Sequence, residues 1–361
     1  MRKTLRLIFF FTYLVTVIPL VACYLSQWIS PSTFWPLAFF GLLFPFLIVS
    51  QFVFLLIFLF LRSKSIVFPI LLIILSWNSL TLTFQFPGTT KPASAVSDDV
   101  KVMTYNVRLF DIPHYWSGQK DPSEGIFNYI SDLKPDILCF QEFAVQNTGK
   151  LSVEFIKNRL SFLPHTAIEF NYSTPNRNHG LAIFSRYPII RSGHEHFEDT
   201  KNMMLFTDIL IGTDTVRVYN NHLESIHFDR DELQWIDTTS NSSRIPRDKI
   251  TEIVNRMKAA YVKRASQAVI VRKNIDSSPY QVIVCGDFND TPVSYATHKI
   301  GSNLYDSFRS GGRWLGITFP NVKAPLRIDY ILHSKEMASD DYLIGKTKFS
   351  DHRPVSCRIK I

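Results

Sequence analysis

The sequence predicts a layered α/β domain that follows an apolar, membrane-inserted segment. Residues 1–90 contain no Asp or Glu, and only five of the 39 Lys and Arg residues lie there. Residues 100–361 instead alternate short β-branched runs with helical patterns. This contrast divides the 361 residues into two parts. Strands and helices that alternate over a stretch of about 260 residues are typical of layered α/β architecture.

Three long apolar stretches predict three transmembrane helices, at about 5–25, 35–61 and 66–86. The first contains one charged residue, Arg6, and the other two contain none. A helix of 21 residues is about 31 Å long, which matches the hydrocarbon core of a bilayer. Membrane helices also tolerate the prolines in these stretches. We therefore expect residues 1–86 to form a multi-pass membrane domain in contact with the lipid bilayer.

The basic residues of this segment predict its orientation. Three of them lie within residues 1–6 and two within residues 62–65, whereas the loop 26–34 carries no charge. The positive-inside rule then places the N-terminus in the cytoplasm, and three crossings place residues 87 onward outside it. Two alternatives remain open: a cleaved signal peptide, or a lipoprotein signal with lipid on Cys23. Both leave the following domain on the same side.

The chain after the membrane segment begins with a small, polar stretch and carries little net charge. Residues 87–99, PGTTKPASAVSDD, predict a flexible linker before a domain at 100–361. Residues 91–361 carry 34 basic against 31 acidic residues, a net charge of about +3. A nucleic-acid-binding domain is normally much more basic. The four cysteines have no CxxC or Cys/His spacing for zinc, and we expect buried thiols.

Within residues 100–361, seven β-branched runs predict strands, and two periodic segments predict helices. The runs are 100–105, 136–140, 180–184, 216–219, 282–285, 328–332 and 355–359. The helices are 123–133 and a long amphipathic one at 249–272.

Carboxylates, amides and imidazoles lie beside six of these runs. They are Asn106, Gln141 with Glu142, Asn220 to His222, Asp287 with Asn289, Asp329, and Asp351 with His352. Each one alone is typical of a turn residue or of a structural histidine. If the strand ends converge, however, the whole set builds one polar pocket at a sheet edge.

This ordered set resembles the endonuclease/exonuclease/phosphatase superfamily. The matching segments are MTYNVRLF (103–110), DILCFQEF (136–143), GLAIFSRYPI (180–189), YNNHLES (219–225), VIVCGDFND (282–290), RIDYIL (327–332) and SDHRPV (350–355). The resemblance covers residues 100–361 and implies a four-layer α/β sandwich, in which two facing mixed β-sheets are flanked by helices. It also implies an active site at one edge, where strands of both sheets end.

Two features depart from particular subfamilies, and one further stretch matches no motif. Some abasic-site endonucleases carry a carboxylate two residues after the first motif Asn, where this chain has Arg108. The signature of the inositol-polyphosphate 5-phosphatases around the penultimate motif is missing from residues 327–330. Residues 226–258 match no motif, and they are either a substrate-facing insertion or a solvent loop. The resemblance therefore specifies the superfamily and leaves the substrate open.

Phosphoester hydrolysis requires charge neutralisation, an activated water and a stabilised leaving oxygen. Glu142 is the best metal ligand, as a hard carboxylate suited to Mg²⁺ or Mn²⁺, and Asp351 is a second acidic ligand. Asn106 can add an amide oxygen or hold a phosphate oxygen. Zinc is disfavoured here because the set is oxygen-rich and lacks Cys.

The remaining residues are expected to perform the chemistry. The resemblance implies that Asp287 orients or deprotonates the attacking water and that Asn289 donates to the phosphate. Asp329 and His352 form a carboxylate–imidazole pair, which fixes the ring tautomer and raises its basicity. His222 lies on the leaving-group side, where it can stabilise the transition state or supply a proton.

The leading hypothesis is a membrane-anchored, divalent-metal-dependent phosphoester hydrolase. Its substrate is a lipid-linked or small extracytoplasmic phosphoester, and an extracellular or periplasmic nuclease is the alternative. A different class is an inactive binding module displayed on the membrane, but every expected position is filled. A purely structural membrane protein is disfavoured because unpaired buried carboxylates are costly. We expect contact with lipid and with a lipid head group, small molecule or nucleic acid, and we predict no protein partner.

Overall fold

Two β-sheets form the centre of the fold, which a computed structural model describes for residues 2–86, 99–111, 122–147, 150–226, 247–320 and 325–361. The first sheet contains β1 (Asp99–Asn106), β2 (Ile137–Gln146), β3 (His165–Ser173), β4 (Arg177–Ser185), β11 (Ala338–Ile344) and β12 (Val355–Lys360). The second contains β5 (Ile189–His196), β6 (Met203–Ile211), β7 (Asp214–His222), β8 (Gln281–Asp287), β9 (Leu304–Asp306) and β10 (Asp329–Ser334).

Both sheets are mixed, and each has one parallel pair of strands at its centre. Their strand orders are β11-β12-β1-β2-β4-β3 and β5-β6-β7-β8-β10-β9. The pairs β1–β2 and β7–β8 are parallel, whereas the other neighbours are antiparallel. Parallel neighbours end at the same edge, so the sequence motifs at the ends of β1, β2, β7 and β8 come together there.

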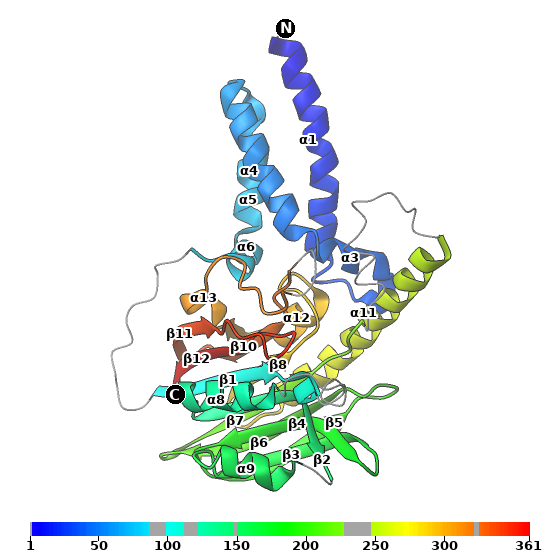
Figure 1. The fold of residues 1–361 in the computed structure, drawn as a ribbon. Coiled ribbons are helices and arrows are strands. Elements are labelled where there is room, and N and C mark those ends of the chain that lie inside the picture. The colour runs from blue at the N-terminus through cyan, green and yellow to red at the C-terminus, as the bar shows by residue number, and fades with distance from the viewer. Residues whose placement is uncertain (1, 87–98, 112–121, 148–149, 227–246, 321–324) are drawn as a thin grey trace.

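Helices cover the outer faces of both sheets and complete four layers (Figure 1). Helices α8 (Ser123–Leu133) and α9 (Val153–Arg159) pack on the first sheet, and α11 (Arg247–Asp276) and α12 (Tyr295–Ile300) pack on the second. Val102, Ile183, Val218 and Ile283 belong to a separate apolar core between the sheets. Apolar residues three or four positions apart, such as Phe127 and Ile130, place one face of each helix on its sheet.

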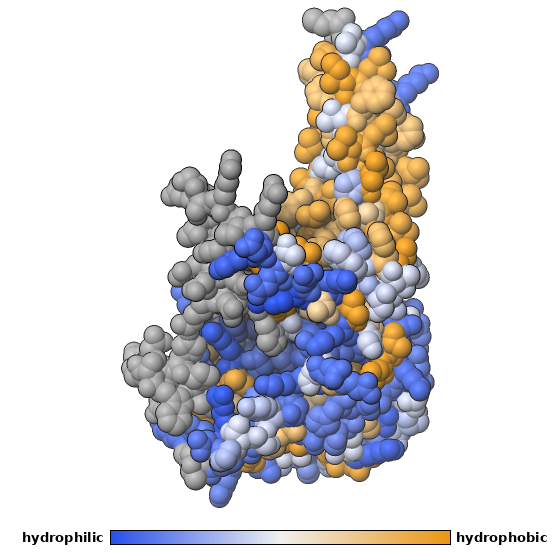
Figure 2. Space-filling model, turned by 90° about the vertical axis from the view of Figure 1, so that its right-hand side faces the viewer, coloured by the Kyte–Doolittle hydropathy of each residue, from blue (hydrophilic) through white to orange (hydrophobic). Residues whose placement is uncertain are grey.

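The N-terminal part of the chain is helical. It contains α1 (Arg2–Leu25), α2 (Pro31–Phe34), η1 (Trp35–Leu37), α3 (Ala38–Gly41), α4 (Phe44–Phe60), η2 (Lys64–Ile66), α5 (Val67–Leu75) and α6 (Trp77–Thr83). Helices α1, α4 and α5 extend away from the α/β layers (Figure 1). Their outward side chains form a predominantly apolar surface, and most of the α/β body is hydrophilic (Figure 2).

Among the described residues, one unbroken helix is long and apolar enough to cross a membrane: α1, over Lys3–Leu25. The expected spans 35–61 and 66–86 differ from straight helices. Pro31–Gly41 bends by 54° into α4, and Lys64–Leu75 bends by 59° into α6. The first bend has a steric reason, because Pro45 in the first turn of α4 has no N–H to continue a ladder from α3. At the second bend, Ser76 has a non-helical ψ of 1°.

These helices pack directly on the α/β body. Val293, in the loop after β8, belongs to an apolar cluster with Leu20, Cys23, Phe44 and Ile48. Cys23 is fully buried in that cluster. Nearby, the backbone of Gln85 pairs with that of Trp314. The contact with the N-terminal helices therefore reaches the loop that follows Asp287.

Several sequence expectations can be compared with these elements. All seven predicted strands and both predicted helices are present, and α11 is longer than expected. The strands β3, β5, β6, β9 and β11 were not predicted. The expected linker 87–99 lies outside the described residues except for Asp99 in β1. Within 226–258, residues 227–246 also lie outside them, and 247–258 form the first part of α11. All four cysteines are free and buried.

Candidate active site

The ends of the central strands bring the predicted polar residues together. Pairing between neighbouring strands places Asn106 beside Gln141 in the first sheet and His222 beside Asp287 in the second. On its other side, Asp287 pairs with Asp329. The loop before β12 supplies Asp351 and His352. All eight candidate residues lie at this one edge, although they come from both sheets.

Two local backbone features aim the side chains into the site. The pairing of β2 with β4 shifts register between Phe140 and Phe143, and Glu142 in this irregularity has a φ of 48°. A bulge of this kind turns a side chain out of the regular ladder. Gly286 has a φ of 142°, and a Cβ there would lie 2.0 Å from the carbonyl oxygen of Asn221. Only glycine fits this close approach, which sets the position of Asp287.

Asn106 is hydrogen-bonded to both central carboxylates, those of Glu142 and Asp287. Its Nδ2 donates to Glu142 Oε1 at 3.1 Å and to Asp287 Oδ2 at 3.0 Å, and its Oδ1 accepts from the backbone N–H of Arg108 at 3.0 Å. The side chain is fully buried. In this arrangement the amide nitrogen, and not the oxygen, faces the carboxylates.

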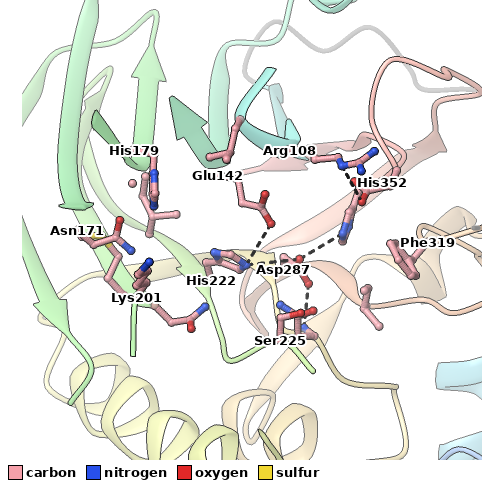
Figure 3. A pocket seen from close by; sticks show the side chains of 18 of the residues that line it. Arg108, Glu142, Asn171, His179, Lys201, His222, Ser225, Asp287, Phe319 and His352 are labelled. Carbon is pink, nitrogen blue, oxygen red and sulfur yellow. Dashed lines mark hydrogen bonds and ion pairs between the residues drawn. The ribbon is translucent and has the colours of Figure 1, made fainter. Parts of the chain in front are cut away.

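His222 lies near the same two carboxylates. Its Nε2 is 3.8 Å from Glu142 Oε1 and 3.9 Å from Asp287 Oδ2 (Figure 3). His222 and Asn106 thus contact the same pair of carboxylates, which must therefore lie close to each other.

Asp329 and His352 form the expected carboxylate–imidazole pair. His352 Nδ1 is 3.0 Å from Asp329 Oδ2, and the other ring nitrogen, Nε2, is 3.6 Å from Asp287 Oδ2. The backbone N–H of Asp329 donates to Thr318 Oγ1 at 3.2 Å, and the ring of Phe319 lies 4.9 Å from that of His352. These contacts fix the imidazole between two carboxylates.

The pKa values of two central groups are displaced from their ordinary range. Burial raises the pKa of Asp287 to about 6, although the neighbouring His352 and His222 oppose this shift. Burial alone would lower the pKa of His352, but the carboxylates of Asp329 and Asp287 outweigh it and raise that pKa to about 10. At neutral pH, His352 is therefore an imidazolium and Asp287 is a carboxylate that can accept a proton.

Glu142 differs from Asp287 in its access to solvent. Burial raises its pKa as well, and the hydrogen bond from Asn106 opposes the shift. Its side chain nevertheless remains 33% exposed, whereas that of Asp287 is 1% exposed. We therefore regard Glu142 as a carboxylate that faces the cavity and Asp287 as one at its base.

The remaining two predicted residues have protein partners. Asn289 Nδ2 donates to the carbonyl of Leu223 at 2.9 Å, and its backbone N–H donates to Asp287 Oδ1 at 2.9 Å. Asp351 Oδ2 lies 3.4 Å from Arg108 Nε. Both residues line the cavity. Ser350, which accepts from the backbone N–H of His352, also donates to the carbonyl of Asn106 at 2.8 Å and so ties this loop to β1.

A cavity of about 460 Å³ lies over these groups, which is within the usual size of a small-ligand site. Its lining is mixed, but the residues differ between its two sides. We call the side with Phe319, Leu326 and Ile328 the apolar half and the side with Asn171, His179 and Lys201 the polar half, although Leu181 and Met203 also line the cavity and Arg108 lies on the side of Phe319. The labelled side chains of the two halves lie on opposite sides of the central residues Glu142, His222 and Asp287 (Figure 3).

Sequence reasoning missed the polar half. Lys201 Nζ lies 4.2 Å from the ring centroid of Tyr172, which stacks on His179 at 4.7 Å. His179 directly precedes the motif GLAIFSRYPI, which is the one signal that pointed toward it. Asn171 and Lys201 lie on strands or turns that were not predicted, so no pattern placed them near the site.

One residue of the motifs has a structural position instead. Gln141 is buried, and its Nε2 donates to Thr104 Oγ1 at 2.9 Å and to Asn220 Oδ1 at 2.6 Å. Asn220 in turn donates to the carbonyls of Phe140 and Ala182. These bonds join β7 of the second sheet to β2 and β4 of the first sheet beneath the site.

The site residues fit a divalent cation. Carboxylates are its hard oxygen ligands, and the pKa of both Glu142 and Asp287 is raised, which a nearby positive charge would offset. Glu142 is also accessible from the cavity. One ligand atom from each of Asp287, Asp329 and His352 also lies within 4.8 Å of the others, but His352 would have to lose its proton to bind a cation there.

Comparison with known proteins agrees with this geometry. The sequence model of the endonuclease/exonuclease/phosphatase family matches residues 103–352. The chain belongs to the endonuclease/exonuclease/phosphatase family. As a member of this family it is a hydrolase that acts on phosphoester bonds. A second family, described as a domain of unknown function, matches residues 5–83. No curated protein sequence matches the chain.

Solved structures share the fold of this family member at low sequence identity. An endonuclease/exonuclease/phosphatase from Beutenbergia cavernae has a TM-score of 0.52 at 16% identity, over 73% of this chain and 72% of that one. The human Nocturnin catalytic domain with bound sulfate has a TM-score of 0.51 at 17% identity, over 76% and 98%. A humanized D. rerio TDP2 has a TM-score of 0.50 at 18% identity, over 73% and 100%.

Proposed function

We propose that this enzyme is a membrane-embedded, divalent-metal-dependent phosphodiesterase that hydrolyses a lipid-linked or small extracytoplasmic phosphoester. The observation that carries the substrate class is the position of Leu326. This residue lines the apolar half of the catalytic cavity, and it also lines a small pocket with Gly41 and Phe44 of the helical segment. The apolar half of the cavity is therefore the half next to the membrane helices.

The two halves of the cavity suit the two ends of such a substrate. A lipid-linked phosphoester has an apolar end that enters from the bilayer and a polar head group that points away from it. Phe319, Leu326 and Ile328 would contact the apolar end, and Asn171 and Lys201 would contact the head group. Because α1 and α4 pack on the loop after β8, this placement depends on direct contact and not on a flexible linker.

The membrane topology forms part of the proposal. We infer that α1 and the two bent helix pairs cross the bilayer three times, with residues 1–86 as the membrane domain and 100–361 as the catalytic domain. Arg6 Nη2 donates to the carbonyls of Leu61 at 2.8 Å and Arg62 at 3.0 Å, so both basic clusters lie at the same end of the helices. The α/β body lies at the other end (Figure 1). With the basic end in the cytoplasm, the catalytic domain is extracytoplasmic.

Each site residue then has a specific role. Glu142 and Asp351 would hold Mg²⁺ or Mn²⁺ together with Asn106, whose amide must turn if it is to offer its oxygen. Such a cation would neutralise charge at the phosphate. Asp287 accepts the proton of the attacking water, which its pKa of about 6 allows at neutral pH.

The imidazoles act on the phosphate and on the leaving group. His352 is held as an imidazolium by Asp329, and its Nε2 donates toward the centre of the site. Asn289 donates to the phosphate after exchanging its bond to the Leu223 carbonyl. His222 stabilises or protonates the leaving oxygen.

One observation favours a nuclease as the second candidate. A structure of D. rerio TDP2 with single-strand DNA product has a TM-score of 0.50 and 16% identity to this chain. Arg108 and Lys201 at the cavity would supply cationic contacts to such a substrate. The weak net charge of residues 91–361 argues against it, because nucleic-acid binding depends on many phosphate contacts.

Initial rates on different substrates decide between these candidates. The detergent-solubilised full-length protein is compared on phospholipid vesicles, single-stranded DNA and double-stranded DNA at physiological salt with Mg²⁺. We expect head-group release from the vesicles and slower or no cleavage of DNA. Efficient DNA cleavage without lipid turnover would instead support the nuclease.

A further inference from the structure

A second group of potential metal ligands lies at another edge of the α/β sandwich. Glu169 on β3 and His194 and His196 on β5 each offer one ligand atom, and these atoms lie within 4.8 Å of one another. His194 Nδ1 is 3.3 Å from Glu169 Oε2, and His196 Nε2 is 3.4 Å from Glu169 Oε1. None of the three lines the catalytic cavity.

The strand pairing explains why these side chains meet. β3 is the last strand of the first sheet and β5 is the first strand of the second, so both are edge strands. Glu169 pairs with Leu181 and His194 pairs with Leu205, and both leucines belong to the core between the sheets. His194 and His196 are two positions apart and therefore face the same way. All three side chains thus point into the gap between the sheets at its open edge.

We propose that Glu169, His194 and His196 form a Zn²⁺ site that joins the two sheets. Two imidazole nitrogens and one carboxylate oxygen are a ligand set that zinc prefers, and water would complete four-coordination. The side chains remain reachable from solvent, at 29%, 43% and 44% exposure respectively.

The arrangement differs from a simple ion pair. Two imidazoles approach different oxygens of the same carboxylate, and their rings lie 4.9 Å apart in an edge-to-face orientation. A single divalent cation between the three donors would bind all of them at once.

The proposed zinc ligands are close in the sequence to residues that line the polar half of the catalytic cavity. Two residues after Glu169, Asn171 lines that cavity, and so does Lys201, five residues after His196. Lys201 also lies over the ring of Tyr172, at 4.2 Å. A metal that joins β3 to β5 would therefore restrict the motion of the polar half of the cavity. This site is separate from the Mg²⁺ or Mn²⁺ position at Glu142 and does not depend on which phosphoester is cleaved.

Zinc binding by the full-length, detergent-solubilised protein tests this site. Binding is measured by isothermal titration in excess Mg²⁺, for the wild type and for Glu169→Gln, His194→Ala and His196→Ala. The control is His165→Ala, which removes a histidine from the same strand as Glu169 but outside the group. Since loss of an outer partner of a metal ligand already costs about 10- to 100-fold in affinity, we expect each ligand variant to bind zinc at least about 100-fold more weakly. His165→Ala should bind as the wild type does.

Two further readouts keep the test decisive if a variant folds poorly. Co²⁺ bound in place of zinc should give the visible absorption bands of a four-coordinate site in the wild type and in His165→Ala, and these should be lost in the nearly isosteric Glu169→Gln. Zinc should also raise the thermal midpoint of the wild type but not that of His194→Ala/His196→Ala. Unchanged zinc affinity and Co²⁺ spectra in folded Glu169→Gln and in the double variant would overturn the proposal.

Discussion

At the scale of single residues, Asp329 and His352 are the most closely coupled pair in the site. Their 3.0 Å contact raises the pKa of His352, so removal of either partner removes the same imidazolium. We expect Asp329→Asn and His352→Asn each to reduce the hydrolysis rate by about 100- to 1000-fold. The double variant should be little slower than the slower single variant, because the two residues act as a unit.

A double-mutant cycle of kcat values measures this coupling. Circular dichroism of each variant controls for folding, since both side chains are buried. Losses that multiply in the double variant would mean that Asp329 and His352 contribute independently.

His179 provides a residue-scale prediction about pH and stability. Burial, together with the positive charges of Arg177, Lys201 and His222, lowers its pKa to about 4. In the unfolded chain an imidazole binds its proton near pH 6.5. Between about pH 6.5 and 4 the unfolded state therefore binds more protons, and the free energy of unfolding falls as the pH falls.

The variant His179→Phe isolates this effect. Phenylalanine keeps a ring against Tyr172, which stacks on His179 at 4.7 Å, but it cannot titrate. We expect the stability of the wild type to fall more steeply than that of the variant from pH 6.5 to 4, and the two slopes to agree above pH 7. Denaturant unfolding at several pH values measures both slopes. Parallel curves over the whole range would contradict the lowered pKa.

At the scale of elements, the contact between the membrane helices and the loop after β8 gives a prediction. A Cβ on Gly41 would lie 2.2 Å from the backbone oxygen of Val293, so alanine there must displace the loop. The same loop contains Asn289 of the catalytic site, four positions before Val293. We therefore expect Gly41→Ala to reduce kcat and the thermal midpoint, although Gly41 lies in the N-terminal helices and outside the α/β layers.

A lipid-facing substitution is the matched control for Gly41→Ala. Val21 is an exposed residue of α1, and Val21→Ala should leave both kcat and the thermal midpoint close to those of the wild type. Equal behaviour of the two variants would mean that the helices do not position the catalytic loop.

Elements also show where sequence reasoning succeeded and where it could not. The strands β1, β2, β7, β8 and β10 were predictable because each is a short apolar run next to a polar motif residue. β3 and β5 are half exposed and mix polar with apolar residues, so their strand pattern is weak. The cluster of Glu169 with His194 and His196 was hidden for the same reason, since its two strands belong to different sheets.

The bends in the apolar stretches could not be predicted from composition either. Hydropathy and length describe residues 35–61 and 66–86 as continuous spans, because membrane helices tolerate proline. The break before α4 lies at Pro45, and the adjacent Phe44 packs with Val293, which is 249 residues after it in the chain. The eight site residues, by contrast, lie in local motifs, and the fold brings all of them to one edge.

At the scale of the whole molecule, the separation of charge along the helices predicts the side of the membrane. Basic residues lie at one end of the helices and the α/β body lies at the other (Figures 1 and 2). A protease added outside intact spheroplasts, or their equivalent, should degrade residues 91–361. A catalytic domain that is cleaved only after lysis would place it in the cytoplasm and reverse the orientation.

According to the proposed function, the protein is held in a bilayer and uses a metal ion to cleave a phosphoester there. Full-length protein reconstituted into phospholipid vesicles tests this directly, through the release of head groups from the same vesicles. We expect release with Mg²⁺, none after chelation, and recovery when Mg²⁺ or Mn²⁺ is restored. Glu142→Gln should fold and release head groups at least about 100-fold more slowly, whereas Glu154→Gln, on the exposed side of α9, should match the wild type. Head-group release by a folded Glu142→Gln protein in EDTA at the wild-type rate would contradict the account.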